Sequence, residues 1–340
     1  MRVDWLLGEE FFCCGFCYFR AIMTYYIKNS FVPVDENQHW EFKGHRNFSA
    51  DEIPAWRPDG SKVCPIRNPK EFAKLTNGVH RTRQPISRNI NGFLNSGKHG
   101  NILIGVLDNG KVEGIPMNSM QKDHLLVNLE DCLRRFQPSV PRELVKVAFI
   151  PVVSSVEELL NYDPEQAKIC EPPDAIRFQP HLLRTSSLCW CEVYSMERQR
   201  KFGFIPQLYV IEIRIAALHP SMRTPEVNKA LTSLIPASAS PFERLSWPAF
   251  INEDHSAFVR VFASVVKYTH LEIEKFNRIQ TQMYIKDLLK LEQDSEEWEK
   301  ETQKLLVLLE DPTVDLIALL NEMVKVQEKP IYSTNPIYSH

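Results

Sequence analysis

Short apolar runs along the chain predict a set of β-strands. The run from Ile102 to Leu107 is rich in branched residues and too short for a stable helix, which is typical of a strand buried on both faces. Asn109 and Gly110 follow it and tolerate the positive φ of a type I′ turn, so the next run is expected to return antiparallel. The same pattern predicts strands near residues 38–43, 101–107, 111–116, 145–152, 188–194 and 208–216.

Apolar residues at helical spacing predict helices between these strands and beyond them. In residues 86–96 the apolar side chains share one face, and Gly97 follows as a residue that commonly ends helices. Residues 120–136 have a similar apolar face, which we expect to cover the sheet. Farther along, residues 256–290 and 296–326 are predicted to form two long helices.

Changes in composition divide the chain into five segments. Arg20 interrupts the apolar run near the N-terminus, so we expect no membrane-spanning helix there. The predicted segments are an apolar N-terminal segment at 1–30, an α+β domain at 31–220, a Pro- and Ser-containing linker at 221–250, a helical extension at 251–328 and a tail at 329–340.

Charge and cysteine content restrict the setting of the protein. A net charge of -3 over 340 residues gives no global attraction to nucleic acid, so any site for a polyanion must be local. The 8 cysteines lack regular spacing and no secretory signal is evident, which favours the cytoplasm or the nucleus. Cys13, Cys14 and Cys17 could suggest zinc or lipid, but without a matching Cys/His pair we interpret them as buried thiols.

Two segments carry side chains with candidate chemistry. Asp108 follows the predicted buried strand, where a carboxylate suits either a turn-stabilising hydrogen bond or a metal ligand. Glu41 and Lys43 share one face of the strand predicted at 38–43, opposite two aromatic side chains. Glu36 lies five residues before Glu41 and would point away from it on a continuous strand. Its convergence with Glu41 therefore requires a bend.

Three sequence blocks, in this order, resemble the Schlafen AlbA-type domain. They are Trp40-Glu-Phe-Lys43, the helical Ile86-x3-Ile90-Asn-Gly-Phe-Leu-Asn95-Ser-Gly, and Ile102-Leu-Ile-Gly-Val-x-Asp108-Asn-Gly-x-Val112-x-Gly114. The resemblance spans about residues 35–138 and continues more weakly to about residue 216. It implies an α+β fold with a Schlafen AlbA-like mixed sheet and packed helices, followed here by the helical C-terminal extension.

The same resemblance implies an RNA-cleaving site built from three carboxylates. In Schlafen ribonucleases two glutamates five apart, the second opening a Glu-Phe-Lys motif, act with an aspartate after a Gly-Val strand. The matching residues here are Glu36, Glu41 and Asp108. Three hard oxygen ligands suit Mg²⁺ or Mn²⁺, which can activate water and offset charge that develops on a phosphodiester. Lys43 could hold the phosphate.

The chain departs from vertebrate Schlafens where those proteins bind zinc. Arg134 and Phe136 stand where a His-x-Cys pair would precede the Gln-Pro dipeptide, and the Cys-Cys pair expected after the following strand is absent. His181 and the Cys189-x-Cys191 pair offer ligands elsewhere. Because the family positions are not filled, we expect no structural zinc.

The resemblance also implies partners, since vertebrate Schlafen nucleases pair two similar lobes and this chain shows one. A second lobe would come from another Schlafen-like subunit or a second copy, as in invertebrate composite endonucleases that trim small-RNA (piRNA) precursors. One hypothesis is therefore a metal-dependent endoribonuclease, alone or as a subunit, with RNA as substrate. The other is a non-catalytic RNA-binding or scaffold subunit. The intact carboxylate trio favours the first, and the net negative charge with the missing lobe favours the second.

Overall fold

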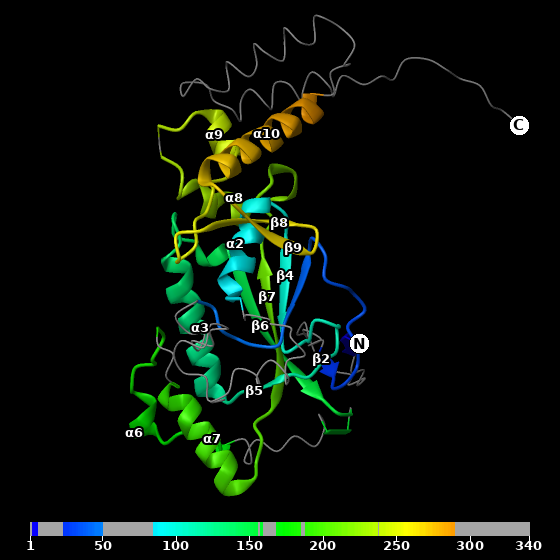
Figure 1. The fold of residues 1–340 in the computed structure, drawn as a ribbon, viewed down its shortest axis with the longest axis vertical. Helices are drawn as coiled ribbons and strands as arrows, with labels where there is room; N and C mark the ends of the chain where they lie inside the picture. Colours follow the sequence, from blue (N-terminus) through cyan, green and yellow to red (C-terminus); the bar gives the residue numbers. More distant parts are fainter. Residues whose placement is uncertain are drawn as a thin grey trace, which may run out of the picture.

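A computed structural model of the chain describes residues 2–5, 23–49, 84–155, 157–158, 168–184, 188–236 and 238–289. In these residues the chain is an α+β protein with a mixed sheet at its middle. Figure 1 shows helices α2 and α3 beside the sheet, with α7 and α10 at opposite ends of the long axis. The α+β class expected from the sequence is confirmed.

The sheet in the described part has seven strands in the order β1-β2-β6-β7-β4-β3, with β5 attached to β7. The pairs β3–β4 and β2–β6 are parallel, and the other neighbours are antiparallel. The strands predicted near 38–43, 101–107, 145–152 and 208–216 are confirmed. The strands are β1 (Arg2–Trp5), β2 (Met23–Ile27), β3 (Trp40–Lys43), β4 (Gly100–Ile104), β5 (Ile115–Pro116), β6 (Val145–Val153) and β7 (Leu208–Ile215).

The chain reverses direction after β4, as the Asn-Gly dipeptide predicts, but through a different turn. Gly110 has a φ of 81° while Asn109 does not take a positive φ, so the type I′ assignment is wrong. Val106 and Val112 form an isolated antiparallel bridge. Beyond this bridge the chain turns away from β4, and β5 pairs with β7 instead. The strand predicted at 111–116 is therefore confirmed only in its last two residues.

Helices α2 (Ile86–Ser96) and α3 (Ser119–Arg134) pack on one face of the sheet and confirm the two helices predicted there. Gly97 ends α2 with a φ of 72°, and Asn118 begins α3 with a capping box. The main core lies between these helices and the sheet, and includes Ile90, Phe93, Leu94, Ile102, Ile104, Leu125, Leu129, Ile211 and Ile213. A second, smaller core on the opposite face includes Tyr26, Phe42, Leu103 and Val210.

The first part of the helix predicted at 256–290 is instead a β-hairpin. β8 (Ala257–Val261) pairs with β9 (Ser264–Tyr268), and only then does α10 (His270–Leu289) begin. The prediction is wrong because a short run of β-branched residues around a turn fits a hairpin as well as it fits helical spacing. Phe262 takes a φ of 53° in that turn. The helix predicted at 296–326 lies outside the described residues.

Two buried asparagines on α2 hold this hairpin against the core. Asn91 Oδ1 accepts a hydrogen bond from the backbone N–H of Phe258 at 2.7 Å, and Asn95 Nδ2 donates to the Phe258 carbonyl at 2.9 Å. Asn95 also donates to the carbonyl of Phe250 at 2.9 Å and accepts from its N–H at 2.7 Å. Because these amides are buried, their bonds fix the position of β8 relative to α2.

Two further predictions are corrected by the structure. Residues 188–194, predicted as a strand, lie at the start of helix α7 (Trp190–Phe202), which Gly203 ends in a left-handed conformation. A short apolar run does not distinguish a strand from the first turn of a helix. The segment expected as a linker at 221–250 contains helices α8 (Pro225–Thr232) and α9 (Pro241–Leu245), and it buries Leu231, Trp247 and Phe250 in the main core.

The apolar N-terminal segment is described only at β1 and β2, and both strands belong to the sheet. Tyr25 and Tyr26 of β2 are buried, in line with the expected packing. Cys13, Cys14 and Cys17 lie outside the described residues. Within the described part, no helix combines the length and the apolar character needed to cross a bilayer.

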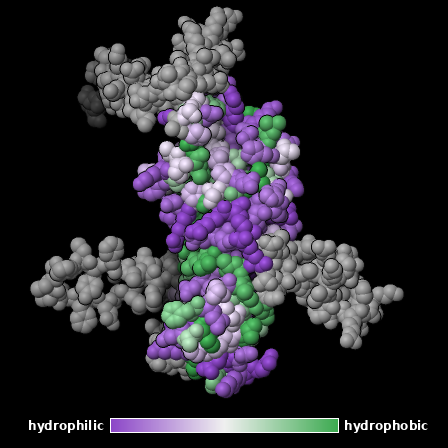
Figure 2. All heavy atoms as spheres, turned by 90° about the vertical axis from the view of Figure 1, so that its left-hand side faces the viewer, coloured by the Kyte–Doolittle hydropathy of each residue, from purple (hydrophilic) through white to green (hydrophobic). Residues whose placement is uncertain are grey.

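Several large apolar side chains are exposed around α7 and the short helix α6 (Asp174–Arg177). Phe178 is 88% exposed, Leu188 57% and Met196 45%. Figure 2 shows apolar residues gathered on the lower half of one face, whereas its upper half is mainly polar. Contiguous apolar surface of this kind commonly marks an interaction site.

Candidate functional site

The candidate site is built on β3, the edge strand of the described sheet. Within the parallel pair β3–β4, Glu41 lies opposite Ile102 and Lys43 opposite Ile104. Paired residues on neighbouring strands project from the same face, so Glu41 and Lys43 lie on the side covered by α2. Phe42 projects to the opposite face and is only 1% exposed. The prediction that Glu41 and Lys43 share a strand face is confirmed.

Glu41 is buried between two cations. Its Oε1 accepts a hydrogen bond from Lys43 Nζ, and its Oε2 accepts one from a guanidinium nitrogen of Arg260. The side chain of Arg260 is 1% exposed and that of Glu41 is 8% exposed, so this ion pair is removed from solvent. A buried charge is tolerated only where an opposite charge matches it. The two hydrogen bonds from Lys43 and Arg260 therefore hold the Glu41 carboxylate in one position.

Arg260 is the site residue that the sequence did not reveal. It lies on β8, and it also donates hydrogen bonds to the carbonyls of Asn37 at 2.7 Å and of Trp40 at 2.8 Å. The guanidinium therefore binds both the backbone before β3 and the carboxylate on it. The available signal was the apolar run interrupted by a single arginine at 257–261, which we read as part of a helix.

Glu36 lies beside β3 because the chain bends immediately before the strand. The side-chain oxygen of Asn37 accepts hydrogen bonds from the N–H groups of His39 at 2.7 Å and Trp40 at 3.2 Å, which builds the bend. Glu36 Oε1 accepts a hydrogen bond from the N–H of Phe42 at 2.8 Å. The bend that convergence of Glu36 with Glu41 requires is therefore present.

The pKa of the Glu36 carboxyl is affected by burial and by charged groups around it, including the other two predicted carboxylates. Burial raises the pKa of Glu36 above its usual 4.5, and the negative charges of Glu41 and Asp108 raise it further. The Phe42 N–H and the Lys43 ammonium oppose this effect. Asp108 itself is exposed in the turn that follows β4. The charges of Glu41 and Asp108 thus reach Glu36, but among the described residues the three carboxylates do not form a group of ligands close enough to hold one ion.

The carboxylates are not, however, the side chains that cluster most closely around a common point. Among the described residues, the group of three or more potential ligands close enough to hold one metal ion is His124, His181, Cys189 and Cys191, whose ligand atoms all lie within 4.8 Å of one another. His124 belongs to α3, His181 to the loop after α6, and the two cysteines to the start of α7. We expected no structural zinc, but the structure brings together a Cys/His group of the kind that suits zinc, which makes it a candidate metal site.

The surroundings of this cluster favour neutral imidazoles. Burial lowers the pKa of His124 to about 4, and His181 and Arg46 add to this effect. Burial also lowers the pKa of His181. A neutral imidazole nitrogen carries the lone pair that a metal requires, so both histidines are in the protonation state of a ligand near neutral pH.

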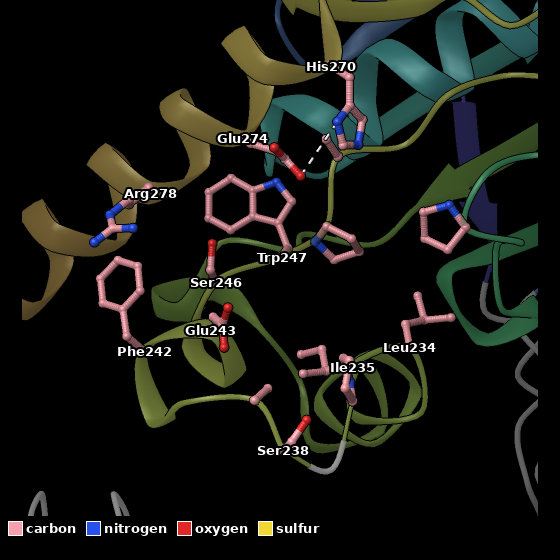
Figure 3. Close-up of a pocket in the computed structure, with 15 residues that line it drawn as sticks. Leu234, Ile235, Ser238, Phe242, Glu243, Ser246, Trp247, His270, Glu274 and Arg278 are labelled. Carbon is pink, nitrogen blue, oxygen red and sulfur yellow. Dashed lines mark ion pairs between the residues drawn. The ribbon is translucent and has the colours of Figure 1, made fainter. Parts of the chain in front are cut away.

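A separate cavity of about 820 Å³ lies between α10 and the segment that contains α8 and α9. Figure 3 shows Trp247 and Phe242 on its walls, with Arg278 and Glu274 projecting from α10. The charged residues on its lining have both signs, and none of the predicted site residues lines it. Neither the carboxylates nor the His/Cys cluster is connected with this cavity.

These features define an α+β protein with a carboxylate-bearing edge strand and a separate Cys/His cluster. Residues 63–167 match a protein-family model described as "Schlafen-like domain, nematodes". The chain therefore contains a Schlafen-like domain of the nematode type, which confirms the resemblance seen in the sequence. The matched segment includes Asp108 and His124, whereas Glu36, Glu41 and Lys43 precede it and the other three members of the cluster follow it.

Proposed function

We propose that this chain is a divalent-metal-dependent endoribonuclease, or a subunit of one, with its site at Glu36, Glu41 and Asp108. The observation that carries the proposal is the bend before β3, which brings the Glu36 carboxylate onto the N–H of Phe42 beside Glu41, where the charge of Asp108 also reaches it. Carboxylates that lie near one another repel, and a bound cation would offset the part of this charge that Lys43 and Arg260 do not match. The Schlafen family, whose domain the chain contains, includes ribonucleases.

The donor set suits Mg²⁺ or Mn²⁺ in its chemistry, since all three groups offer hard oxygen ligands. A divalent ion bound there would lower the pKa of a coordinated water and offset charge on a phosphodiester. The residues of the chain provide the remaining functions. Arg260 holds the Glu41 carboxylate in place, and Lys43, half-buried beside it, provides a positive charge for a phosphate oxygen.

We propose that the partner, besides RNA, is another Schlafen-like subunit or a second copy of the chain. The described sheet has one edge strand, β3, that carries a candidate carboxylate, whereas the vertebrate nucleases of the family that the sequence resembles use two lobes. Exposed apolar side chains around α6 and α7 support a further subunit, because such surface is commonly covered in complexes. A role in piRNA-precursor processing, in the cytoplasm or nucleus, follows from the resemblance to invertebrate members.

One observation favours a second candidate, a non-catalytic RNA-binding or scaffold subunit. Both oxygens of Glu41 already accept hydrogen bonds from cations, namely Lys43 and Arg260. A carboxylate whose charge is matched in this way has less to gain from a metal ion. In this alternative the ion pairs are structural, and RNA would be bound without being cut.

An RNA-cleavage assay on the full-length chain with its co-purifying subunits distinguishes the two candidates. We expect cleavage of single-stranded or hairpin RNA in Mg²⁺ or Mn²⁺ and none in EDTA, because a bound metal would activate the water that attacks the phosphodiester. Binding of the same RNA should be measured in parallel. Binding without cleavage in every assembly and with either metal would contradict the enzyme and support the scaffold.

A further inference from the structure

The strongest feature outside the carboxylate site is the cluster of two histidines and two cysteines between α3 and α7. We propose that His124, His181, Cys189 and Cys191 form a closed structural zinc site that ties the start of α7 to α3. The proposal concerns the stability and assembly of the domain, and it does not depend on whether the carboxylates cleave RNA.

Three of the six distances between the ligand atoms match the edges of a zinc tetrahedron, and all six lie within 4.8 Å. Zinc bonds of about 2.0–2.1 Å to nitrogen and about 2.3 Å to sulfur give edges of about 3.4 Å between two nitrogens and about 3.6 Å between nitrogen and sulfur. The two Nδ1 atoms of His124 and His181 are 3.2 Å apart. Cys189 Sγ is 3.5 Å from His181 Nδ1, and Cys191 Sγ is 3.5 Å from His124 Nδ1. Three of the six edges therefore have the required length.

The ligand types select zinc over the hard cations proposed for the carboxylate site. Two thiolates and two imidazoles form one of the common four-ligand sets of structural zinc, and Mg²⁺ rarely accepts sulfur. Cys189 and Cys191 are 4% and 1% exposed, so the two sulfurs are removed from solvent, while the two histidines are partly buried. The backbone N–H of Leu182 donates to Cys189 Sγ at 3.3 Å, a contact that orients the sulfur from outside the ligand set. Two thiolates also neutralise the charge of the ion, which suits a buried site.

The metal-free alternative is a hydrogen-bonded cluster of neutral groups. One imidazole would donate its Nδ1–H to the other, and each thiol would donate to a nearby acceptor. That arrangement gives each histidine a hydrogen-bond partner. It gives no reason for the two buried sulfurs each to lie 3.5 Å from one of these Nδ1 atoms. A single four-coordinate ion accounts for all of these contacts together.

This site differs from the zinc positions of vertebrate Schlafens. Those positions correspond to Arg134 and Phe136 and to the residues after β7, none of which is a ligand here. His124 lies ten residues before Arg134 on the same helix, a separation of about 15 Å along the helix axis. The cluster is therefore nearer the other end of α3.

The zinc site would also support β3, the strand that carries Glu41 and Lys43. Glu192, the residue after Cys191, forms an ion pair with Arg46, which lies three residues beyond Lys43. Gln121 of α3 donates to the other carboxylate oxygen of Glu192 at 2.9 Å. By fixing the first turn of α7, the metal would fix Glu192 and with it the segment that leaves β3.

Metal analysis of the full-length protein tests the proposal. Protein purified without chelator should carry about one zinc per chain, as measured by elemental mass spectrometry after gel filtration. The Cys189→Ser/Cys191→Ser double variant and His124→Ala should lose it, whereas Cys170→Ala, which removes a buried cysteine outside the cluster, should retain it. Wild-type protein without zinc after purification from zinc-supplemented medium would overturn the proposal, as would equal zinc content in the wild type and the ligand variants.

X-ray absorption on the wild-type protein covers the case in which the ligand variants fail to fold. The zinc edge should report two nitrogen neighbours at about 2.0–2.1 Å and two sulfur neighbours at about 2.3 Å. Cobalt substitution should likewise give the strong visible absorption of a tetrahedral site and a thiolate charge-transfer band. A first shell without sulfur would show that the bound metal lies elsewhere and would overturn the assignment.

Discussion

The Asp108→Asn substitution is expected to lower the rate of metal-dependent RNA cleavage by a factor on the order of 10²–10³, the usual loss when one group that stabilises the transition state is removed. Asn keeps the size of the side chain but removes the charge that a divalent ion requires. Because Asp108 is exposed in a turn, the folded structure should be unaffected. Single-turnover cleavage of labelled RNA measures the effect, and circular dichroism monitors folding.

Glu113→Gln provides the matched control for this substitution. Glu113 is another exposed carboxylate in the segment after the same turn, but it is not part of the proposed site. Cleavage by this variant should remain within about twofold of wild type, since surface changes are usually near neutral. Equal rates for wild type, Asp108→Asn and Glu113→Gln would exclude Asp108 from the active site.

The Arg260→Met substitution is expected to lower the free energy of unfolding by about 3 kcal/mol, the lower part of the range for breaking a buried ion pair. Met replaces the stem of arginine but leaves Glu41 buried with Lys43 as its remaining charged partner. The hydrogen bonds to the carbonyls of Asn37 and Trp40 are lost as well. Urea denaturation of the full chain, followed by circular dichroism, measures the change.

Two further variants separate this ion pair from general effects of the substitution. Lys267→Met makes a similar cation-to-Met change at an exposed position of β9 in the same hairpin, so its stability should stay within about 0.5 kcal/mol of wild type. Adding Glu41→Gln to Arg260→Met should restore part of the lost stability, because the uncompensated charge is removed. If Arg260→Met were as stable as Lys267→Met, the ion pair would not be what holds the hairpin to β3.

Much of the core could be predicted from the sequence because its signals are local. The branched run of β4 and the apolar face of α2 specify a buried strand and an amphipathic helix whatever surrounds them. The pairing of Glu41 with Lys43 on one face follows from the two-residue period of a strand. The sequence showed that Glu36 and Glu41 can converge only if the chain bends before β3, but it did not predict the bend. The bend depends on which backbone N–H groups donate to the side chain of Asn37.

The remaining site features depend on contacts between distant segments. Arg260 is 219 residues from Glu41 in the sequence, and its position follows from the asparagines of α2 that hold β8. The His/Cys cluster brings together residues of α3, a loop and α7. These histidines and cysteines were visible in the sequence. We looked for zinc ligands only at the positions that vertebrate family members use, and so did not combine these four residues into one site. Spacing along the chain does not determine distance across the core.

The apolar run at 188–194 shows the limit of short patterns. Its first residues precede α7, and the helix continues into a charged stretch that a strand of the core would not contain. Cys189 and Cys191 therefore lie at the beginning of a helix, where they can reach His124 and His181. On the strand we expected, the same two sulfurs would have shared one face without any partner from α3.

Binding of Mn²⁺ to the full-length protein, followed by electron paramagnetic resonance, tests most directly whether Glu36, Glu41 and Asp108 form a divalent-cation site. The proposed site predicts that the wild type binds Mn²⁺ and that the Glu36→Gln/Asp108→Asn double variant binds it at least tenfold more weakly, because two of three anionic ligands are lost. The Glu113→Gln variant should bind like the wild type. Equal Mn²⁺ affinity in the wild type and the double variant, or no binding by either, would contradict the proposed site.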